Sequence, residues 1–423
     1  MDGEVVRVAG HLEEYRALGG VAFALVRDVG GTTQVTLKKG VADATLFPLF
    51  AELPRESVVE VEGKVQRSEK AQRGVELLPS AVRVLARAET PLPLGVVDKV
   101  GADLDTRFNH RVLDLRKPAV RNIFELRTAL LAGFRAAFRE RGFLEIETPK
   151  ILREGVEGGA TLFPVDYFET RAYLAQSPQL YKQMMMSAGF ERVFEIGPAF
   201  RAEKSDTVRH LTEFTSLDLE IAYPDGAEGL RTVLEGAVAD AFRSTRAELE
   251  RRANPLAAGI PALTLPLPRI PFATAEEWLG RPGAERDFGA DDERAIGERV
   301  ERELGTPLYF LTDYPTAVKA HTFYAMRQDA NPKATWYHDL DFRGVEIASG
   351  GIREHRYDRL TANLAAADLD PAKFAGYLEA FRFGMPPHGG YGLGIDRLVQ
   401  LLAGLPNIRE ARLFPRDRYR LDP

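Results

Sequence analysis

The chain has 423 residues, of which 45% are hydrophobic and 28% are charged, and its formal net charge is -6 at pH 7. This is the composition of an ordinary soluble globular protein, and the length predicts two or three domains. The absence of cysteine excludes disulfides, thiolate catalysis and cysteine-ligated zinc, and no apolar run is long enough to span a bilayer. The N-terminal residues MDGEVVRVAG have neither the basic flank nor the apolar stretch of a signal peptide, so we expect a cytoplasmic protein. The acidic balance counts mildly against a nucleic-acid partner, although a local groove can be positive on an acidic protein.

Residues 1–95 are predicted to form a small β-barrel. This stretch contains five segments of strand-like composition, separated in places by glycine pairs. The segments are EVVRVAGHL, VAFALVRD, TTQVTLKK, SVVEVEGKVQR and VELLPSAVRVLA. Five short strands in fewer than a hundred residues favour a barrel. The next stretch, ETPLPLGVVDKVGADLDTR, has two prolines and mixed charge, so we expect a linker over residues 96–119.

A second domain is predicted from residue 120 to residue 423, where helical patterns begin. VRNIFELRTALLAGFRAAFRERG predicts an amphipathic helix ending at Gly142. Its apolar face consists of Ile123, Leu126, Leu130, Phe134 and Phe138. FLEIETPKI predicts a strand, and SPQLYKQMMMSAG predicts a helix with Ser177 as N-cap and Pro178 at the first helical position. GLRTVLEGAVADAFRSTRAEL predicts another helix, and GGYGLGIDRLVQLLAGL predicts a glycine-rich strand that runs into a helix.

The segment FRAEKSDTVRHLTEF, residues 200–214, carries many charges directly after an apolar stretch that predicts a buried strand. Burying charges costs free energy unless something pairs with them. Arg201 and Glu203 are two residues apart, so they are predicted to share one face of the strand. Two interpretations fit this pattern. Either the segment is a solvated hairpin with surface ion pairs, or a charged ligand binds between the strands.

The segment GYGLGIDRL has the glycines of a dinucleotide-binding fingerprint, but only about thirty residues follow Gly394, too few for that fold. Arg397 lies just inside the predicted helix, where its guanidinium and the backbone N–H groups can both meet an anion. Taken alone, this pattern is explained as well by a tight turn with a surface arginine.

Other charged residues favour a ligand site. Asp339, Glu346 and Arg353 follow one another at intervals of seven residues, and Gln179 and Lys182 are one helical turn apart. These residues supply cations, two carboxylates suited to a hard divalent cation, and polar groups for a small zwitterion. The inventory fits a site that binds phosphate, Mg²⁺ and an amino acid together.

The segments FLEIETP, FRAE…RHLTEF…LDLE and GLGIDR resemble motifs 1, 2 and 3 of the class II aminoacyl-tRNA synthetases, in the expected order. With SPQLYKQ and GVEIASGGIREHR between them, the chain resembles the aspartyl-tRNA synthetase family from end to end, in the short form found in archaea and eukaryotes. The resemblance implies an α+β fold, with an OB-fold barrel before a catalytic domain built on an antiparallel sheet flanked by helices.

The resemblance also implies the reaction. Such enzymes join an amino-acid carboxylate to the α-phosphate of ATP, release pyrophosphate, and pass the acyl group to the terminal ribose of tRNA. Positioning and charge neutralisation supply the catalysis. Arg201 and Arg397 are the expected catalytic residues, and Mg²⁺ is expected at Asp339, Glu346 and Ser349. The residues expected to bind ATP are Arg201, Glu203, Arg209, His210, Leu211, Phe214, Glu346, Gly394 and Arg397.

Within that set the resemblance assigns particular roles. Arg201 contacts the α-phosphate and the reacting carboxylate, while Glu203 contacts the adenine amino group. Phe214 and Arg397 enclose the base, and His210 reaches the terminal phosphates. For each residue the alternative is a surface ion pair of little energetic value.

Aspartate carries one negative charge more than asparagine, so its pocket should present more than one cation. By resemblance Lys182 and Arg353 bind the side-chain carboxylate, although most helical lysines are simply exposed. Asp218 is expected to bind the ammonium group together with Glu157 of the segment EGGA. The residues expected at aspartate are Glu157, Gln179, Lys182, Asp218, Ser349 and Arg353.

The barrel is expected to bind the anticodon of tRNA by stacking unpaired bases and reading their edges. By resemblance Phe23 is the stacking ring, with Gln34 and Glu76 as edge readers and Arg27 as a weaker candidate. Phe23 is equally explicable as a core residue. Motif 1 implies a homodimer with Pro149 at the interface.

The expected partners are therefore tRNA(Asp), L-aspartate and ATP, with no membrane. Whether tRNA(Asn) is a second substrate stays open, because Glu13 and Gln72 match neither pattern expected at the discriminating positions. The nearest alternative is an asparaginyl-tRNA synthetase or a related asparagine-forming ligase, against which Lys182, Asp218 and the barrel argue. A non-catalytic nucleic-acid-binding relative is the other alternative, but such a protein is expected to lose motif residues that this chain retains.

Overall fold

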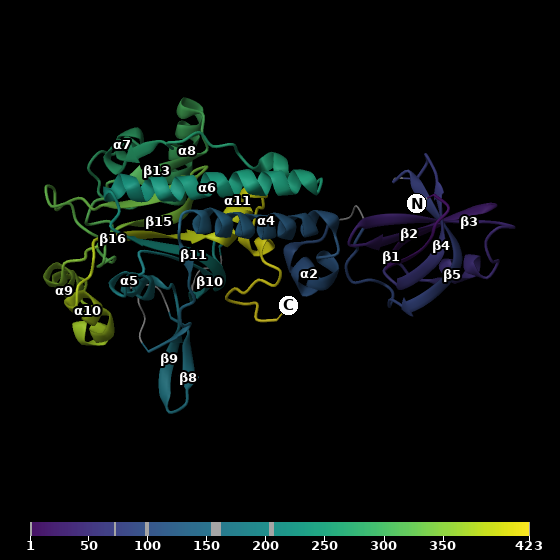
Figure 1. Ribbon diagram of the computed structural model, residues 1–423, viewed down its shortest axis with the longest axis horizontal. Coiled ribbons are helices and arrows are strands. Elements are labelled where there is room, and N and C mark those ends of the chain that lie inside the picture. Colours follow the sequence, from purple (N-terminus) through teal and green to yellow (C-terminus); the bar gives the residue numbers. More distant parts are fainter. Residues whose placement is uncertain (1, 72, 98–100, 154–161, 203–206, 423) are drawn as a thin grey trace. The chain divides into compact units, whose positions relative to one another are not determined.

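The computed structural model describes residues 2–71, 73–97, 101–153, 162–202 and 207–422 (Figure 1). Contacts divide the chain into two compact units, Met1–Asp114 and Leu115–Pro423. Across the described residues, none of the helices is long and apolar enough to cross a membrane.

The first unit contains the predicted barrel. Its strands close in the order β1-β2-β3-β5-β4, and α1 (Leu46–Glu52) connects β3 to β4. The strands are β1 (Val5–Leu18), β2 (Val21–Asp28), β3 (Gly31–Lys38), β4 (Val58–Arg67) and β5 (Val75–Ala86). Because side chains of a strand alternate between its two faces, Ala22, Ala24 and Val26 fill the barrel core while the residues between them face away from it. Two short helices, α2 (Leu104–Asn109) and α3 (Arg111–Asp114), complete this unit.

The second unit is built on a sheet whose order, within the described residues, is β12-β13-β14-β15-β16-β11-β10-β6. Neighbouring strands are antiparallel except at the pairs β12–β13 and β6–β10, which are parallel. The strands are β6 (Leu144–Glu145), β10 (Arg192–Phe200), β11 (Glu213–Ala222), β12 (Arg269–Pro271), β13 (Leu308–Thr312), β14 (Tyr337–Phe342), β15 (Glu346–Ile352) and β16 (His388–Gly394). The expected fold is therefore confirmed, with parallel pairs added at both edges of the sheet.

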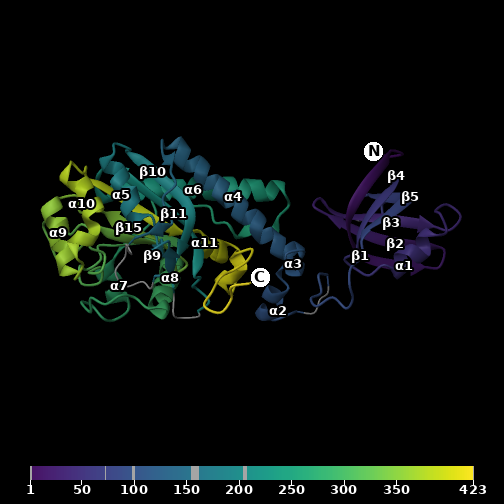
Figure 2. The same cartoon turned by 90° about the horizontal axis from the view of Figure 1, so that it is seen from below.

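Two long helices, α4 (Pro118–Glu140) and α6 (Gly226–Arg251), lie side by side over the sheet (Figures 1 and 2). All five residues predicted for the apolar face of α4 are buried in the main core. The two helices approach closely at Gly133, where a Cβ atom would lie 2.6 Å from the hydroxyl of Ser244. The remaining α-helices are α5 (Gln179–Ser187), α7 (Phe272–Trp278), α8 (Ala290–Leu304), α9 (Tyr357–Ala366), α10 (Ala375–Arg382) and α11 (Ile395–Leu402).

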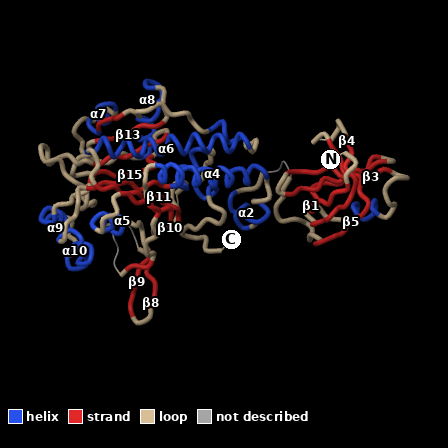
Figure 3. The backbone as a smooth tube through the Cα atoms, viewed as in Figure 1, coloured by secondary structure: helices blue, strands red, loops and turns tan. Residues whose placement is uncertain are grey.

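A small sheet projects from this unit (Figure 3). It consists of β7 (Ile151–Leu152), β8 (Pro164–Tyr167) and β9 (Thr170–Leu174), in the order β7-β9-β8.

Two local predictions were wrong in extent. FLEIETPKI is not one strand, because only its two ends belong to strands. Between them Thr148 donates its backbone N–H and its hydroxyl to the carboxylate of Glu195, at 3.3 and 2.7 Å, and Pro149 has no N–H for a sheet ladder. The helix α5 begins at Gln179 rather than at Pro178, and Ser177 Oγ accepts a hydrogen bond from the Gln179 N–H at 3.3 Å.

Candidate active site

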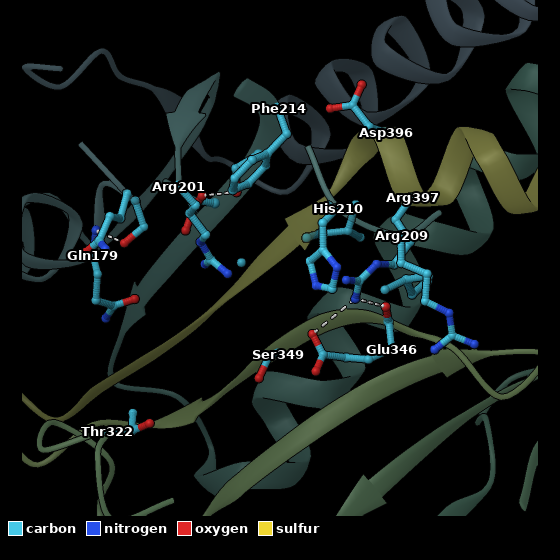
Figure 4. Close-up of a pocket in the computed structure, with 18 of the residues that line it drawn as sticks. Gln179, Arg201, Arg209, His210, Phe214, Thr322, Glu346, Ser349, Asp396 and Arg397 are labelled. Atoms are coloured by element: carbon cyan, nitrogen blue, oxygen red, sulfur yellow. Dashed lines mark hydrogen bonds and ion pairs between the residues drawn. The ribbon is translucent and has the colours of Figure 1, made fainter. Parts of the chain in front are cut away.

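A cavity of about 680 Å³ lies in the second unit and is lined from β11, β15, β16, the start of α5 and α11, and adjoining loops. Most of the residues predicted for ATP and amino-acid binding line it together. They are Gln179, Arg201, Arg209, His210, Leu211, Phe214, Asp218, Glu346, Ser349, Gly394 and Arg397. Figure 4 shows side chains of this group converging from separate elements. Residues that the resemblance assigns to ATP and to aspartate therefore line one common cavity.

Arg201 and Phe214 belong to the hairpin of β10 and β11. The backbone N–H of Arg201 donates to Thr212 O at 2.9 Å, directly after β10 ends at Phe200. The guanidinium carbon of Arg201 lies 5.3 Å from the centre of the Phe214 ring, so the cation and the ring form one surface of the cavity. The expected placement of Glu203 on the same strand face concerns a residue outside the described part of the chain.

Arg397 enters the cavity from the first turn of α11. Its Nη1 donates to the carbonyl oxygen of Glu346 at 2.7 Å, and the same nitrogen lies 3.7 Å from the Glu346 carboxylate (Figure 4). Asp396 beside it accepts hydrogen bonds from Thr215 N–H and from Arg127 Nη1, both at 2.6 Å. These bonds fix the start of α11 to β11 and α4, and thereby place Arg397 opposite the hairpin.

Arg209 and His210 lie between β10 and β11, shortly before β11 begins. Arg209 Nη1 lies 3.1 Å from Glu293 Oε2 of α8. His210 Nδ1 lies 2.5 Å from the hydroxyl oxygen of Thr207. Both residues line the cavity, where Arg209 pairs with the carboxylate of Glu293.

Asp339 lies under the cavity wall and contacts two residues that line it. Ser349, its partner across the β14–β15 ladder, donates its hydroxyl to Asp339 Oδ1 at 2.5 Å. Lys319 Nζ lies 3.1 Å from Asp339 Oδ2, and 4.1 and 4.9 Å from the ring centres of Tyr314 and Tyr337. Sequence analysis missed Lys319, which comes from the long segment between β13 and β14.

The carboxylates of this wall repel one another. Burial raises the pKa of Glu346 above its ordinary value, and the charge of Asp339 raises it further. Burial also raises the pKa of Glu293, with Glu346 adding to the shift. Burial alone would lower the pKa of Lys319, but the charges around it, that of Asp339 foremost, together outweigh burial and raise the pKa. Excess negative charge here favours any cation that can reach it.

The residues Asp339, Glu346 and Ser349 would by themselves coordinate a metal ion only in part. In the described part of the chain, His, Asp and Glu side chains nowhere come together in threes in an arrangement that would hold a metal ion. Asp339, Glu346 and Ser349 nevertheless provide hard oxygen atoms with unbalanced negative charge. Mg²⁺ is commonly bound by one or two carboxylates together with substrate phosphates, so this donor set fits such an ion.

Lys182 is buried beside the cavity rather than exposed. Its Nζ donates to Asp218 Oδ1 at 2.9 Å and to Tyr391 O at 3.0 Å, and lies 3.6 Å from Glu220 Oε2. Ser216 Oγ donates to the other oxygen of Asp218 at 2.5 Å. Lys182, Asp218 and Glu220 thus belong to one packed charge network, which the sequence did not predict.

Arg353 is the second buried cation. Its Nε donates to Glu220 Oε1 at 3.0 Å, and its Nη2 lies 3.4 Å from Gln179 Oε1. Its Nη1 has no hydrogen-bond partner among the described residues, although the side chain is 1% exposed. A buried guanidinium nitrogen without a partner is costly and indicates a place for an anionic ligand.

Glu220 was also missed by sequence analysis, although it holds both cations of the pocket. It lies two residues after Asp218 on β11, so the segment LDLE contained the signal. Glu157, the remaining residue predicted for this pocket, lies outside the described residues.

The barrel residues lie on its outer face. Phe23 is half-buried and points away from the core formed by its neighbours Ala22 and Ala24. Gln34 Nε2 and Thr36 Oγ1 donate to Glu76 Oε2, at 3.3 and 2.8 Å.

Further charged residues of the barrel are paired. Lys38 Nζ lies 3.1 Å from Glu76 Oε1. Burial would raise the pKa of Glu76, but hydrogen bonds from Thr36 and Lys38 outweigh it and lower the pKa. Arg27 pairs with the buried Glu56 at 2.7 Å and with Glu13 at 3.4 Å. Its contacts are those of a structural ion pair.

Comparisons with known proteins cover the whole chain. Residues 103–418 match the family described as tRNA synthetases class II (D, K and N), and residues 3–85 match the OB-fold nucleic acid binding domain. The full chain is 47% identical to an aspartate–tRNA(Asp) ligase of Thermococcus kodakarensis and covers 97% of it. It is 46% identical to an aspartate–tRNA(Asp/Asn) ligase of Methanopyrus kandleri, again covering 97%. Among solved structures, an asparaginyl-tRNA synthetase from Pyrococcus horikoshii complexed with asparaginyl-adenylate matches with a TM-score of 0.89 and 32% identity, over 100% of this chain and 97% of that one.

Proposed function

The chain belongs to the class II tRNA synthetases of the aspartate, lysine and asparagine group, and we propose that it is an aspartate–tRNA ligase. It activates L-aspartate with ATP to form aspartyl-adenylate and pyrophosphate, and transfers the aspartyl group to the 3′ end of tRNA(Asp). The observation that supports this most is that Arg201 and Arg397 share one cavity with Gln179 and Asp218, which contact the two buried cations Arg353 and Lys182.

In the first step an oxygen of the substrate's α-carboxylate attacks the α-phosphorus of ATP, and the bond from that phosphorus to pyrophosphate breaks. Both reactants are anionic, so the residues must offset their repulsion. Arg201 binds the α-phosphate and the carboxylate, and its contact with Phe214 holds the guanidinium in place. Positioned cations in a site that excludes water supply most of the acceleration.

The ends of ATP have separate partners. Phe214 and Arg397 enclose the adenine, with Gly394 and Leu211 beside it and Glu203 at its amino group. Arg209 and His210 bind the terminal phosphates, for which Arg209 exchanges its ion pair with Glu293. When Arg209 leaves, the carboxylate of Glu293 loses its partner. Another cation must then lie near Glu293 and Glu346 to compensate their negative charge.

Mg²⁺ would be held by Asp339, Glu346 and Ser349. Bound there, it would neutralise charge on the phosphates. Lys319 contacts one oxygen of Asp339 and Ser349 donates to the other, so the orientation of the carboxylate is fixed.

The substrate's ammonium group binds Asp218 and Glu157, and its side-chain carboxylate binds Lys182 and Arg353, with Gln179 and Ser349 completing the pocket. Asparagine lacks the negative charge that these cations bind. With asparagine bound, Nη1 of Arg353 would stay without an anionic partner, and leaving a buried donor unpaired is costly, so the neutral analogue is rejected. An asparaginyl enzyme is therefore the less favoured alternative.

In the second step a hydroxyl of the terminal ribose of tRNA attacks the aspartyl carbonyl carbon, and AMP leaves. The barrel binds the anticodon, with Phe23 stacking on a base and Gln34 and Glu76 reading base edges. The enzyme acts as a cytoplasmic homodimer, with the exposed Pro149 at the interface.

Exchange of labelled pyrophosphate into ATP tests the first step. We expect exchange with aspartate, little with asparagine, and none with the Arg201→Ala variant, whose fold is checked by its melting curve. Robust exchange with asparagine would assign the chain to the asparaginyl enzymes, and no exchange with either would refute an activating role.

Charging of purified tRNA(Asp) and tRNA(Asn) tests the tRNA partner. We expect tRNA(Asp) to be charged with aspartate. Charging of tRNA(Asn) as well would place the chain with relatives such as the Asp/Asn ligase of M. kandleri.

A further inference from the structure

A chain of four hydrogen bonds runs behind the amino-acid pocket. It joins Arg353 Nη2 to Gln179 Oε1 at 3.4 Å, and Gln179 Nε2 to Gln183 Oε1 at 2.9 Å. It continues from Gln183 Nε2 to His388 Nε2 at 2.9 Å, and from His388 Nδ1 to Pro386 O at 2.8 Å. Gln179 lines the cavity, whereas Gln183 and His388 do not and are wholly buried.

The two ends of this chain fix its direction. The guanidinium of Arg353 can only donate hydrogen bonds, and the carbonyl of Pro386 can only accept them. Gln179 must therefore turn its oxygen towards Arg353 and its amide N–H towards Gln183. Gln183 must in turn donate to His388 Nε2, and His388 must donate from Nδ1. Each link has one donor and one acceptor only in this arrangement, and bonds aligned in one direction strengthen one another.

The imidazole of His388 must be neutral for this arrangement, because a proton on Nε2 would face the N–H of Gln183. Burial lowers the pKa of His388 to about 4, so the ring stays neutral under ordinary conditions. A proton on Nε2 would force both amides to turn over. The N–H group of Gln179 would then face the guanidinium of Arg353, donor against donor.

We propose that His388 and Gln183 are positioning residues for the amino-acid pocket, which orient the Gln179 amide so that its oxygen accepts from Arg353 Nη2, a nitrogen that Glu220 Oε2 also contacts at 3.3 Å. This role rests on the proposed function, because it concerns how the same pocket binds aspartate. We call the chain of hydrogen bonds from Arg353 to Pro386 the relay. Its residues act on aspartate binding rather than on the phosphoryl step, since Arg201, Arg397 and Glu346 do not contact them. Loss of the relay should therefore raise the KM for aspartate and leave kcat largely unchanged.

Two substitutions of His388 distinguish the hydrogen bond at Nε2 from the bond at Nδ1, and a third substitution, at Tyr377, is the control. In His388→Asn the amide reaches the position of Nδ1 and keeps the bond to Pro386, but it is too short to contact Gln183. In His388→Gln the amide oxygen reaches the position of Nε2 and accepts from Gln183. Tyr377→Phe is the matched control, because it removes the other hydrogen bond to Gln183 Oε1, at 3.2 Å, and leaves the relay intact.

The full-length variants are compared by aspartate-dependent pyrophosphate exchange. We expect His388→Asn to raise the KM for aspartate about tenfold, the effect of one lost buried hydrogen bond, and to reduce the preference for aspartate over asparagine. His388→Gln and Tyr377→Phe should stay within about twofold of the unmodified enzyme. Equal KM values for His388→Asn and the unmodified enzyme, or equal losses in His388→Asn and His388→Gln, would overturn the proposal.

A measurement on the unmodified protein covers the case in which a variant does not fold. Nitrogen NMR of ¹⁵N-histidine-labelled protein should show His388 as the neutral tautomer protonated at Nδ1, unchanged on adding aspartate. A proton on Nε2 would refute the relay. Absence of exchange in the unmodified enzyme would instead refute the proposed function, so the two failures are distinguishable.

Discussion

The ammonium nitrogen of Lys182 lies 2.9 Å from Asp218 Oδ1, and the side chains are only 2% and 4% exposed. Replacing Lys182 by methionine keeps the volume but leaves Asp218 and Glu220 with less compensation in a buried site. We expect the free energy of unfolding to fall by about 3–5 kcal/mol and aspartate-dependent exchange to be lost. Urea unfolding and exchange kinetics measure the two effects.

Arg269→Met is the matched control for this substitution. Arg269 pairs with the buried Glu235 at 2.7 Å but does not line the cavity. The Arg269→Met variant should have a lower free energy of unfolding than the unmodified protein but the same KM for aspartate. A normal aspartate KM in Lys182→Met would contradict the assignment of the pocket.

Asp396 connects three elements, since its two oxygens accept from Thr215 N–H and Arg127 Nη1. In Asp396→Asn one of these donors faces an N–H group. We expect a loss of about 1–3 kcal/mol in stability and a raised KM for ATP, because Arg397 and Phe214 depend on this junction. Combining it with Arg127→Met should cost less than the sum of the two single losses. Strict additivity in urea unfolding would show that the bond between them contributes nothing.

Stability should depend on pH through His388. Its pKa is lowered by burial from 6.5 to about 4 in the folded protein, so between these values the unfolded chain binds a proton that the folded chain does not. Stability conferred by the neutral ring is therefore fully present above about pH 6.5 and is lost as the pH falls towards 4, with a limiting slope of about 1.4 kcal/mol per pH unit. His388→Gln should flatten this acid limb in urea unfolding between about pH 5 and 7. Identical slopes in both proteins would contradict the burial of a neutral ring.

Lys319 and a divalent cation should compete for the charge of Asp339. In Lys319→Met the ammonium 3.1 Å from Asp339 is removed, so the carboxylate wall gains uncompensated charge. We expect a lower melting temperature without metal and a larger rise on adding Mg²⁺ than in the unmodified protein. Lys319→Arg keeps the charge and should respond as the unmodified protein does. A Mg²⁺ response that is the same in all three would show that this wall does not bind the ion.

A substitution in the barrel should impair tRNA binding without affecting the activation of aspartate by the second unit. Phe23→Leu removes a ring from the outer face of the barrel, and the loss of one stacked base costs about 1–3 kcal/mol. We expect a KM for tRNA raised by about tenfold or more, with aspartate-dependent exchange unchanged. Leu18→Ala, at an exposed apolar residue of β1, is the control and should alter neither. An unchanged tRNA KM in Phe23→Leu would remove this ring from the proposed anticodon surface.

Much of the cavity followed from local sequence. Arg201 and Arg397 follow an apolar strand and open a helix, respectively, and such junctions are readable from the change in hydrophobic period, whereas Phe214 was assigned through the family resemblance. Once β10, β11 and β16 pair in one sheet, their ends must meet, so these residues converge without further information.

Residues outside such junctions could not be placed in this way. Lys319 comes from a segment with no periodic pattern, and only the fold brings it between Tyr314 and Tyr337. The extent of FLEIETPKI was mispredicted for a similar reason, because the side chain of Glu195 takes the Thr148 N–H from a distant part of the chain. The roles of all the site residues remain predictions, and Glu203 and Glu157 lie outside the described part of the chain.

The floor of the amino-acid pocket contains two cations, Lys182 and Arg353, and two anions, Asp218 and Glu220, so its formal charges cancel. Such a floor exerts little long-range attraction, and it recognises an amino acid only at contact distance. Added salt screens interactions over about 8–10 Å, but it acts weakly on buried pairs at contact. Raising the ionic strength should therefore weaken the capture of tRNA while leaving the choice between aspartate and asparagine almost untouched.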